Sequence, residues 1–325
     1  MPMGNITVAI LGAQGYGANL GKKGTSTDIT LYNLKKGENT VTFIEPTRYP
    51  ERLAPLFYAV ALAKKAIVVV DEVNATLGEC LVMLQCSDIK SGYIILRNYI
   101  PKEKIQPLIK GTSIEKFEII NDDPNQIRES LLKEAAELKP VEVPTGQQAV
   151  GAVPVDHAFN VKGVGVVVLG IVIYGVVQKH AVLNALPAAK SAQVRSIQKH
   201  DDEFDVAWEG DRVGFALKNV EVEDLDRGTV LTNDPSIKTA TKLQAQASLV
   251  RYWQTPLKDG MVVHVGHWTQ FLTAKVEAAT DAGDWRKTTL TLTLDRPLVY
   301  RANDRAVLMY LEGAKLRVAG TLELP

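Results

Sequence analysis

The sequence changes its pattern at about residue 138, and this change constrains the fold more than any other feature. Before it, short apolar runs of the β type alternate with segments whose apolar residues recur at helical spacing. This alternation predicts a mostly parallel sheet with helices on its faces. After it, apolar runs recur every roughly 8–12 residues with turn residues between them, as in antiparallel sandwiches and barrels. We therefore expect an α/β domain followed by two β-barrels.

The same pattern predicts individual elements and domain limits. We predict strands over residues 6–11, 29–34, 40–45, 66–70 and 93–97, and helices over 51–65, 77–85 and 125–137. The turn at 35–39 predicts an antiparallel hairpin at one edge of the sheet. The Pro- and Gly-rich stretch 139–156 predicts a linker, and a break near 232–235 divides the β part. The expected domains are 1–145, 146–234 and 235–325.

Composition and charge exclude several classes of protein. Lys and Arg number 37, as do Asp and Glu, so the net charge is zero and we expect no DNA partner. No apolar run approaches the roughly 20 residues of a membrane helix. A secretory signal requires a basic segment before its apolar run, and none precedes the first apolar run of this sequence. We expect a monomeric cytoplasmic protein with no membrane contact.

The cysteines and histidines do not predict a metal site. Cys80 and Cys86 fit neither a disulfide framework nor a zinc spacing, and we expect two buried thiols. His264 and His267 lie three apart in an expected strand, so their side chains should face opposite sides. No Ser-His-Asp order, nucleophile elbow or paired carboxylates are evident, and we expect no catalytic residue.

A glycine loop follows the first expected strand. Gly12 and Gly17 have the glycine spacing of the phosphate-binding motif G-x-x-x-x-G-K-S/T, but Ala18 and Asn19 stand where that motif has Lys and Ser or Thr. One alternative is a dinucleotide loop with Glu45 as its acidic residue, although Glu45 comes 28 residues after Gly17, farther than usual. Another alternative is a tight turn without a ligand.

The β part carries the clearest resemblance. The segments VPVDHAFNVKGVGVVVLGIVIYG (153–175), VRSIQKHDD (194–202) and WEGDRVGFALKNVEVEDLDRGTVL (208–231) resemble the second domain of archaeal SelB elongation factors, a family of the EF-Tu superfamily. KTATKLQAQASLV, LKDGMVVHVG and LEGAKLRVAG resemble its third domain. Within that family the chain is most similar to the paralogous group EF-Pyl of pyrrolysine-using archaea.

The resemblance implies a GTPase-like α/β domain that has lost its motifs. Tyr49 stands at the position of the family's catalytic histidine, and 97–100 (RNYI) stands where the family reads guanine with N-K-x-D. Gly12, Gly17, Ala18 and Asn19 would be the remnant of the nucleotide loop. The implication is a degenerate P-loop domain with no GTP or magnesium cofactor and no GTPase activity.

The resemblance also implies a site on the barrels. Asp156, His157 and Arg212 match the family's aminoacyl pocket; the alternative is an ion pair that holds the barrel mouth. The third domain carries basic candidates for tRNA contact: Arg251, Arg286, Lys287, Arg301 and Arg305.

Three functions follow from this resemblance. The first is an aminoacyl-tRNA-binding factor that can meet the ribosome. The second is a slow GTP-binding factor. The third is a ribosome-associated regulatory protein without tRNA.

Overall fold

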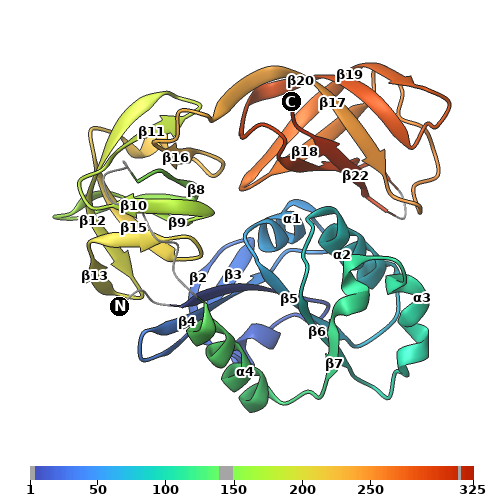
Figure 1. The fold of residues 1–325 in the computed structure, drawn as a ribbon, viewed down its shortest axis with the longest axis horizontal. Coiled ribbons are helices and arrows are strands. Elements are labelled where there is room, and N and C mark those ends of the chain that lie inside the picture. Colours follow the sequence, from blue (N-terminus) through green and yellow to red (C-terminus); the bar gives the residue numbers. More distant parts are fainter. Residues whose placement is uncertain (1–3, 139–148, 314–315) are drawn as a thin grey trace.

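The computed structural model describes residues 4–138, 149–313 and 316–325, so most of the predicted linker and the boundary at 145/146 lie outside the described residues. Figure 1 shows an α/β domain and two β domains, in the predicted order along the chain. The third domain is a closed antiparallel barrel, and the second closes through a pairing of its first two strands. The predicted fold class is confirmed.

The α/β domain is a seven-stranded sheet of order β2-β3-β4-β1-β5-β6-β7. Its strands are β1 (Asn5–Leu11), β2 (Lys22–Ser26), β3 (Ile29–Lys36), β4 (Asn39–Pro46), β5 (Lys65–Val70), β6 (Gly92–Leu96) and β7 (Glu118–Ile120). β2, β3 and β4 pair antiparallel, and the strands from β4 to β7 pair parallel. The hairpin expected at one edge is therefore present, extended by the unpredicted strand β2.

Helices cover both faces of this sheet. Successive side chains of its buried strands point to opposite faces, so each face presents apolar residues for a helix to cover. Its helices are α1 (Ala54–Ala61), α2 (Ala75–Cys86), α3 (Gln106–Ile109) and α4 (Pro124–Glu137), with short 3-10 turns η1 (Tyr16–Asn19), η2 (Lys102–Lys104) and η3 (Ser113–Lys116). Ala9 and Leu11 of β1 belong to the core beneath α1 and α2. Val8 and Ile10 belong to the core beneath α4. The sheet thus has apolar residues on both faces, as a parallel sheet requires.

Two of the three predicted helices match the structure closely, and the third was predicted too long. Helix 51–65 is wrong at both ends: α1 covers only Ala54–Ala61. Lys65 already pairs with Val8 as the first residue of β5, so strand pairing ends the helical segment. The linker prediction is also wrong for 151–156, which begin β8. Val153 and Val155 fill the core of the second domain, and this burial outweighs the signal of Pro154.

The second domain contains β8 to β16. These are β8 (Gly151–Val161), β9 (Gly165–Ile171), β10 (Tyr174–Gln178), β11 (Val182–Leu186), β12 (Lys190–Lys199), β13 (Asp202–Phe204), β14 (Val206–Trp208), β15 (Arg212–Lys218) and β16 (Val230–Thr232), with the turn η4 (Val222–Asp224). The path β8-β16-β11-β12-β15-β9 closes through pairing of β9 with β8.

The third domain is a barrel of order β17-β20-β19-β18-β21-β22. Its strands are β17 (Lys238–Leu249), β18 (Val262–His267), β19 (Gln270–Asp281), β20 (Lys287–Tyr300), β21 (Arg305–Met309) and β22 (Val318–Glu323). β17, β19 and β20 are the long strands of this barrel, with 12, 12 and 14 residues.

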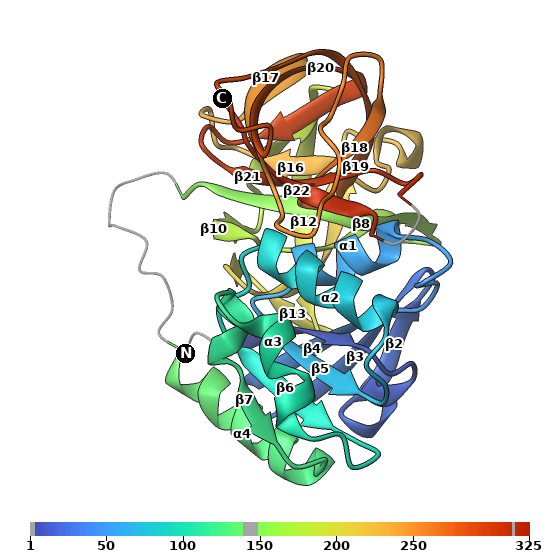
Figure 2. The same cartoon turned by 90° about the vertical axis from the view of Figure 1, so that its right-hand side faces the viewer.

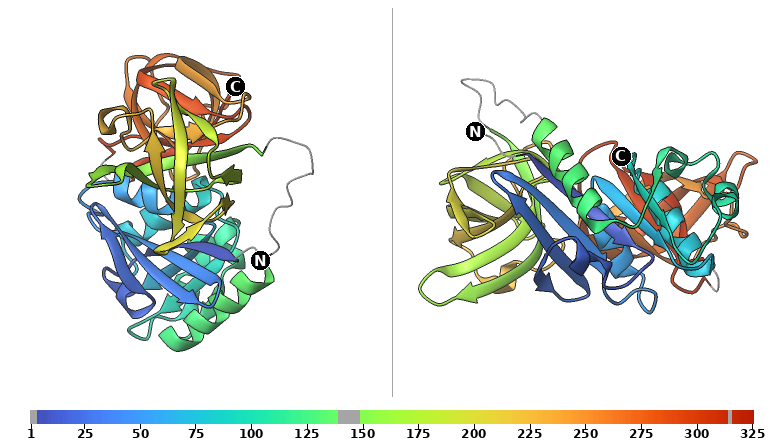
Figure 3. Two further views of the ribbon diagram at one scale, coloured as in Figure 1. Left: turned by 90° about the vertical axis from the view of Figure 1, so that its left-hand side faces the viewer. Right: turned by 90° about the horizontal axis from the view of Figure 1, so that it is seen from below.

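The two β domains contact different sides of the α/β domain. The second domain lies beside β2, β3 and β4, and the third lies over α1 and α2 (Figures 1 and 3). Figure 2 shows α4 on the far side of the sheet from the third domain. At the third-domain contact the ring of Phe57 fills the space in front of Gly266, where a Cβ atom would lie 2.6 Å from it. No helix within the described ranges is long and apolar enough to cross a membrane.

Candidate functional site

The glycine loop leaves β1 and turns into η1. Gly12 and Gly15 have φ values of 96° and 79°, in the left-handed region that favours glycine. A Cβ atom on Gly12 would lie 2.0 Å from the carbonyl oxygen of Val69, so the backbone of β5 also requires glycine there. Ala18 and Asn19, the remaining loop residues of the prediction, are exposed.

A carboxylate of the chain itself binds this loop. Glu45, near the end of β4, is buried, and its two oxygens accept hydrogen bonds from the backbone N–H groups of Gly15 and Gly17. The Gly17 nitrogen lies 3.0 Å from Oε2 of Glu45. β1 connects to β4 through η1 and a hairpin rather than through one crossover helix, so the loop is not part of a β-α-β dinucleotide unit.

Side chains also fill the space beyond the loop. The hydroxyl of the buried Tyr16 donates a hydrogen bond of 2.7 Å to the carboxylate of Asp122. The guanidinium of Arg97 lies 5.1 Å from the centre of the Tyr16 ring. Arg97 pairs with Asp122 at 2.7 Å and with Asp71 at 3.5 Å. Burial, together with the bond to Asp122, raises the pKa of Tyr16 above its ordinary value. Arg97 and Asp122 therefore hold Tyr16 in place as a neutral donor.

The cavity next to the loop is acidic. It measures about 340 Å³. Its lining includes the carboxylates of Glu45, Asp71 and Glu72, and no lysine, arginine or histidine of the described residues lines it. Tyr49 also lines it; this buried tyrosine donates a hydrogen bond to the carbonyl oxygen of Thr76 over 2.9 Å. Burial raises the pKa of Tyr49 far above its ordinary value, so its hydroxyl stays protonated.

The three residues predicted for the aminoacyl pocket lie together in the second domain, on the side that meets the α/β domain. Arg212 makes two hydrogen bonds to the carboxylate of Asp156, one of them over 3.0 Å. Nδ1 of His157 lies 2.5 Å from Oδ1 of Asp156, and Nε2 lies 3.3 Å from the hydroxyl of Thr27. Although burial alone would raise the pKa of Asp156, Arg212 and His157 hold it below its usual range.

Arg227, which no sequence motif marked as a site residue, joins this group to the α/β domain. Arg227 donates one hydrogen bond of 2.7 Å to each carboxylate oxygen of Asp28. Its guanidinium lies 4.8 Å from the ring centre of Tyr58. The bond from Nε of Arg227 to the carbonyl oxygen of Asp156 measures 3.3 Å. No local pattern could have paired Arg227 with Asp28, 199 residues away.

A cationic cleft lies between the first two domains. It measures about 780 Å³. The α/β domain contributes the cations Lys22, Lys23, Lys35 and Arg128. The second domain contributes the cation Arg212 and the imidazole of His200. Burial, then Lys35 and Arg212, lowers the pKa of His200, so its ring is neutral at neutral pH. Asp201 is the one carboxylate in the lining, so we call this the cationic cleft.

Two of the basic residues predicted for tRNA contact share a second cleft, between the α/β and third domains. Arg251 and Arg305 line it with Lys90 and Lys116, around a volume of about 620 Å³. Arg305 lies 3.5 Å from Asp88.

The other three candidates lie elsewhere. Arg301 pairs with Asp304, and its guanidinium lies 4.9 Å from the ring centre of Tyr174. Arg286 lies over Trp285 and donates to the carbonyl oxygen of Trp253, and Lys287 is exposed at the start of β20.

The two histidines of β18 and the two cysteines are wholly or partly buried. His267 is buried 3.3 Å from Asp304, and burial lowers the pKa of His264, which lies against Phe271. Cys80 and Cys86 are buried free thiols. Among the described residues, no group of His, Cys, Asp and Glu is arranged to hold a metal ion.

Comparison with known proteins identifies relatives of the whole chain. The uncharacterized protein MJ0325 of Methanocaldococcus jannaschii is 36% identical over 324 residues, which covers 99% of this chain and 100% of that protein. The chain belongs to the same family as MJ0325. Within this MJ0325-family chain, residues 165–232 match the model of elongation factor Tu domain 2.

The MJ0325-family chain also resembles selenocysteine-specific elongation factors. The factor of M. jannaschii is 27% identical over 263 residues, which is 75% of this chain and 55% of that factor. Two crystal structures of SelB from Methanococcus maripaludis share its fold. The apo form has a TM-score of 0.78 at 21% identity, and the complex with the GTP analogue GPPNHP has 0.80 at 20%. Each covers 100% of this chain, which spans 80% and 79% of the two SelB chains. The three-domain architecture is therefore that of SelB.

Proposed function

We propose that this chain is a SelB-type translation factor of the EF-Pyl group that binds aminoacyl-tRNA, with its α/β domain serving as a scaffold without nucleotide. In this proposal it acts in the cytoplasm and can deliver its tRNA to the ribosome. The observation that carries the proposal is the cationic cleft between the α/β and second domains.

The cationic cleft suits the end of an RNA chain. Its volume of about 780 Å³ falls within the range of natural ligand sites. Lys22, Lys23 and Arg128 have no ion-pair partner among the described residues, so these three cations are free to contact phosphates. The neutral ring of His200 can stack on a base or exchange hydrogen bonds with it.

Arg212 connects the cationic cleft to the residues predicted for the aminoacyl pocket. Arg212 lines the cleft, and its guanidinium donates a hydrogen bond to the carboxylate of Asp156. His157 keeps part of its side chain exposed beside Thr27. This arrangement supports an aminoacyl pocket in the second domain, with Asp156 as the positioning residue.

In this proposal the third domain contacts the tRNA as well, through the second cleft. Arg251 and Lys116 have no carboxylate partner among the described residues, while Asp88 is shared by Lys90 and Arg305. We assign the helical part of the tRNA to these four cations and assign no contact to Arg286, which its neighbours already hold.

The residues at the glycine loop do not fit a nucleoside triphosphate. The N–H groups of Gly15 and Gly17 already bind the carboxylate of Glu45. The adjoining cavity presents three carboxylates and no cation to the phosphates that would enter it. The side chains that the motif uses for phosphate and magnesium are replaced by Ala18 and Asn19. These features support a scaffold role.

A filter-binding titration tests the tRNA proposal. Charged tRNA should bind more tightly than deacylated tRNA, and the logarithm of the binding constant should fall linearly with the logarithm of salt concentration. Replacing Lys22 and Lys23 together with alanine should lower the magnitude of this slope by about 2, because two phosphate contacts are lost.

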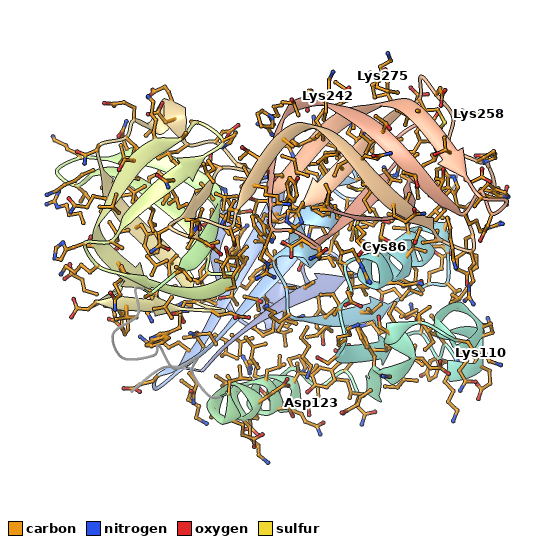
Figure 4. The ribbon with its side chains drawn as sticks, turned by 45° about the horizontal axis from the view of Figure 1, so that its top comes forward. Cys86, Lys110, Asp123, Lys242, Lys258 and Lys275 are labelled. Atoms are coloured by element: carbon orange, nitrogen blue, oxygen red, sulfur yellow. The ribbon has the colours of Figure 1, made fainter. Side chains whose placement is uncertain are left out.

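The matched control is the pair Lys242→Ala and Lys275→Ala. Figure 4 shows both side chains on the outer side of the third barrel, away from the α/β domain. Their removal should leave the slope unchanged. Absent or salt-independent binding of every charged tRNA would refute the proposal, and sedimentation with ribosomes would then favour the regulatory alternative.

Calorimetry tests the scaffold role. Titration with GTP or GDP at millimolar concentration, with and without magnesium, should produce no binding heat. Saturable heat with either nucleotide would instead identify a GTP-binding factor.

A further inference from the structure

We infer that Glu45 is a built-in ligand of the glycine loop, which takes the place of a bound anion. The inference rests on the proposal that the α/β domain holds no nucleotide. Each oxygen of the carboxylate accepts one backbone N–H, from Gly15 and from Gly17. Successive N–H groups in a turn that alternates left- and right-handed conformations form a concavity that binds anions. Here that concavity is filled from within the chain.

The sheet brings the two partners together. β4 pairs with β1 in parallel, and Ala9 lies opposite Ile44. Because neighbouring parallel strands end at the same edge of a sheet, Glu45 reaches the loop that leaves β1. Tyr32 also confines the loop: a Cβ atom on Gly17 would lie 2.4 Å from its ring. Both Glu45 and Tyr32 therefore contact the loop.

Electrostatics require this pairing. Glu45 is only 5% exposed, and a buried carboxylate needs hydrogen bonds or a cation to offset its lost hydration. Among the described residues, no lysine, arginine or histidine nitrogen forms an ion pair with Glu45. The two loop N–H groups supply its hydrogen bonds, and the carboxylate supplies the acceptor that the loop would otherwise take from a phosphate. Each group therefore satisfies the other without an external ligand.

The test combines substitution with chemical rescue. Glu45→Ala should lower the melting temperature by about 5 °C, because two charge-assisted hydrogen bonds are lost. Inorganic phosphate should then raise the melting temperature of Glu45→Ala with a saturable dependence, since it can occupy the vacated concavity. The wild type should show only the gradual increase that phosphate causes in any protein. Chloride at matched ionic strength is the reference salt.

A second variant and a control complete the design. Glu45→Gln keeps the shape of the side chain but only one acceptor oxygen, so amide hydrogen exchange at residues 12–19 should be faster than in the wild type. Glu38→Ala removes an exposed carboxylate in the turn before β4 and should change neither property. Equal phosphate shifts in wild type and Glu45→Ala, or unchanged exchange in Glu45→Gln, would overturn the inference. Binding of GTP by the wild type would remove the scaffold proposal instead, so the two failures are distinguishable.

Discussion

At the scale of single residues, Asp156 is the most constrained charge in the candidate site. Its carboxylate is buried, holds Arg212 through two hydrogen bonds and is in contact with His157. The sequence placed these three residues in one pocket but left open whether they form a ligand site or an ion pair. The structure shows the ion pair, and only His157 and Arg212 also face solvent-accessible space.

Replacing Asp156 with asparagine should destabilise the protein by about 3–5 kcal/mol, because Arg212, whose side chain is only 10% exposed, loses its counter-charge. Urea denaturation at neutral pH measures the change. Glu277→Gln, which disrupts the exposed pair with Lys275, should cost far less. Equal losses in the two variants would contradict this prediction.

The same carboxylate should contribute to acid sensitivity. Burial tends to raise the pKa of Asp156, but Arg212 and His157 bring it below the ordinary 3.8. A lowered pKa in the folded state stabilises the fold above 3.8, and this stabilisation is lost as the pH falls through the folded value. Stability measured from pH 5 downwards should therefore fall more steeply in the wild type than in Asp156→Asn. Parallel curves would show that Asp156 does not contribute.

Gly12 offers a residue-scale test of why the loop keeps its glycines. Gly12→Ala should cost about 1–3 kcal/mol or more, because its φ is positive and the new Cβ meets the Val69 carbonyl. Gly15→Ala has a positive φ but open space around it, so we expect only about 1 kcal/mol. Thermal unfolding of both variants checks the order, and a larger loss at Gly15 would contradict it.

At the scale of elements, local signals account for the helices that were predicted well. α2 begins after Asn74, whose side chain accepts the N–H of Leu77, and α4 begins after Asp123, which accepts from Asn125 and Gln126. Both caps and both apolar patterns lie within a few consecutive residues, so the sequence alone reveals them. The end of α1 was missed because it depends on the pairing of Lys65 with Val8.

The cap of α4 provides the element-scale prediction. Asp123→Ala should destabilise the protein by about 1 kcal/mol, because two N–H groups of the first helical turn lose their acceptor. Figure 4 places Asp123 at the exposed start of this helix, so no core packing changes with it. Glu129→Ala, at an exposed position of the same helix, should stay within about 0.5 kcal/mol of the wild type. Chemical denaturation distinguishes the two.

At the scale of the whole molecule, charged pairs join the α/β domain to both barrels. Asp28 pairs with Arg227 and Lys64 with Glu209 towards the second domain. Towards the third domain, Glu79 of α2 accepts from the backbone and the guanidinium of Arg317. Together with Phe57 against Gly266, these contacts join the α/β domain to both barrels.

A double-mutant cycle of Glu79→Gln and Arg317→Met tests the contact with the third domain. The pair is nearly buried, with side chains 6% and 20% exposed, so we expect a coupling energy of about 1–3 kcal/mol. Either single variant should also let the third domain unfold at a lower temperature than the rest. Calorimetric melting measures both effects. A coupling energy near zero would show that packing, rather than this pair, holds the domains together.

The sequence by itself determined the order of an α/β domain and two β domains, nearly the whole extent of α2 and α4, and the glycine loop. These features depend on periodicity and turn chemistry, which a few neighbouring residues express. The resemblance to SelB was also visible from the sequence, because the motifs between 153 and 231 are contiguous.

Only the tertiary structure decided what the loop binds and which charges meet. Glu45 lies 28 residues from Gly17, Arg227 lies 199 from Asp28, and Glu79 lies 238 from Arg317. Their partners depend on strand register and on how the domains dock, since these place distant residues within hydrogen-bonding distance. The glycine loop therefore looked like a phosphate site without its lysine, and the fold shows a loop that the chain's own carboxylate already satisfies.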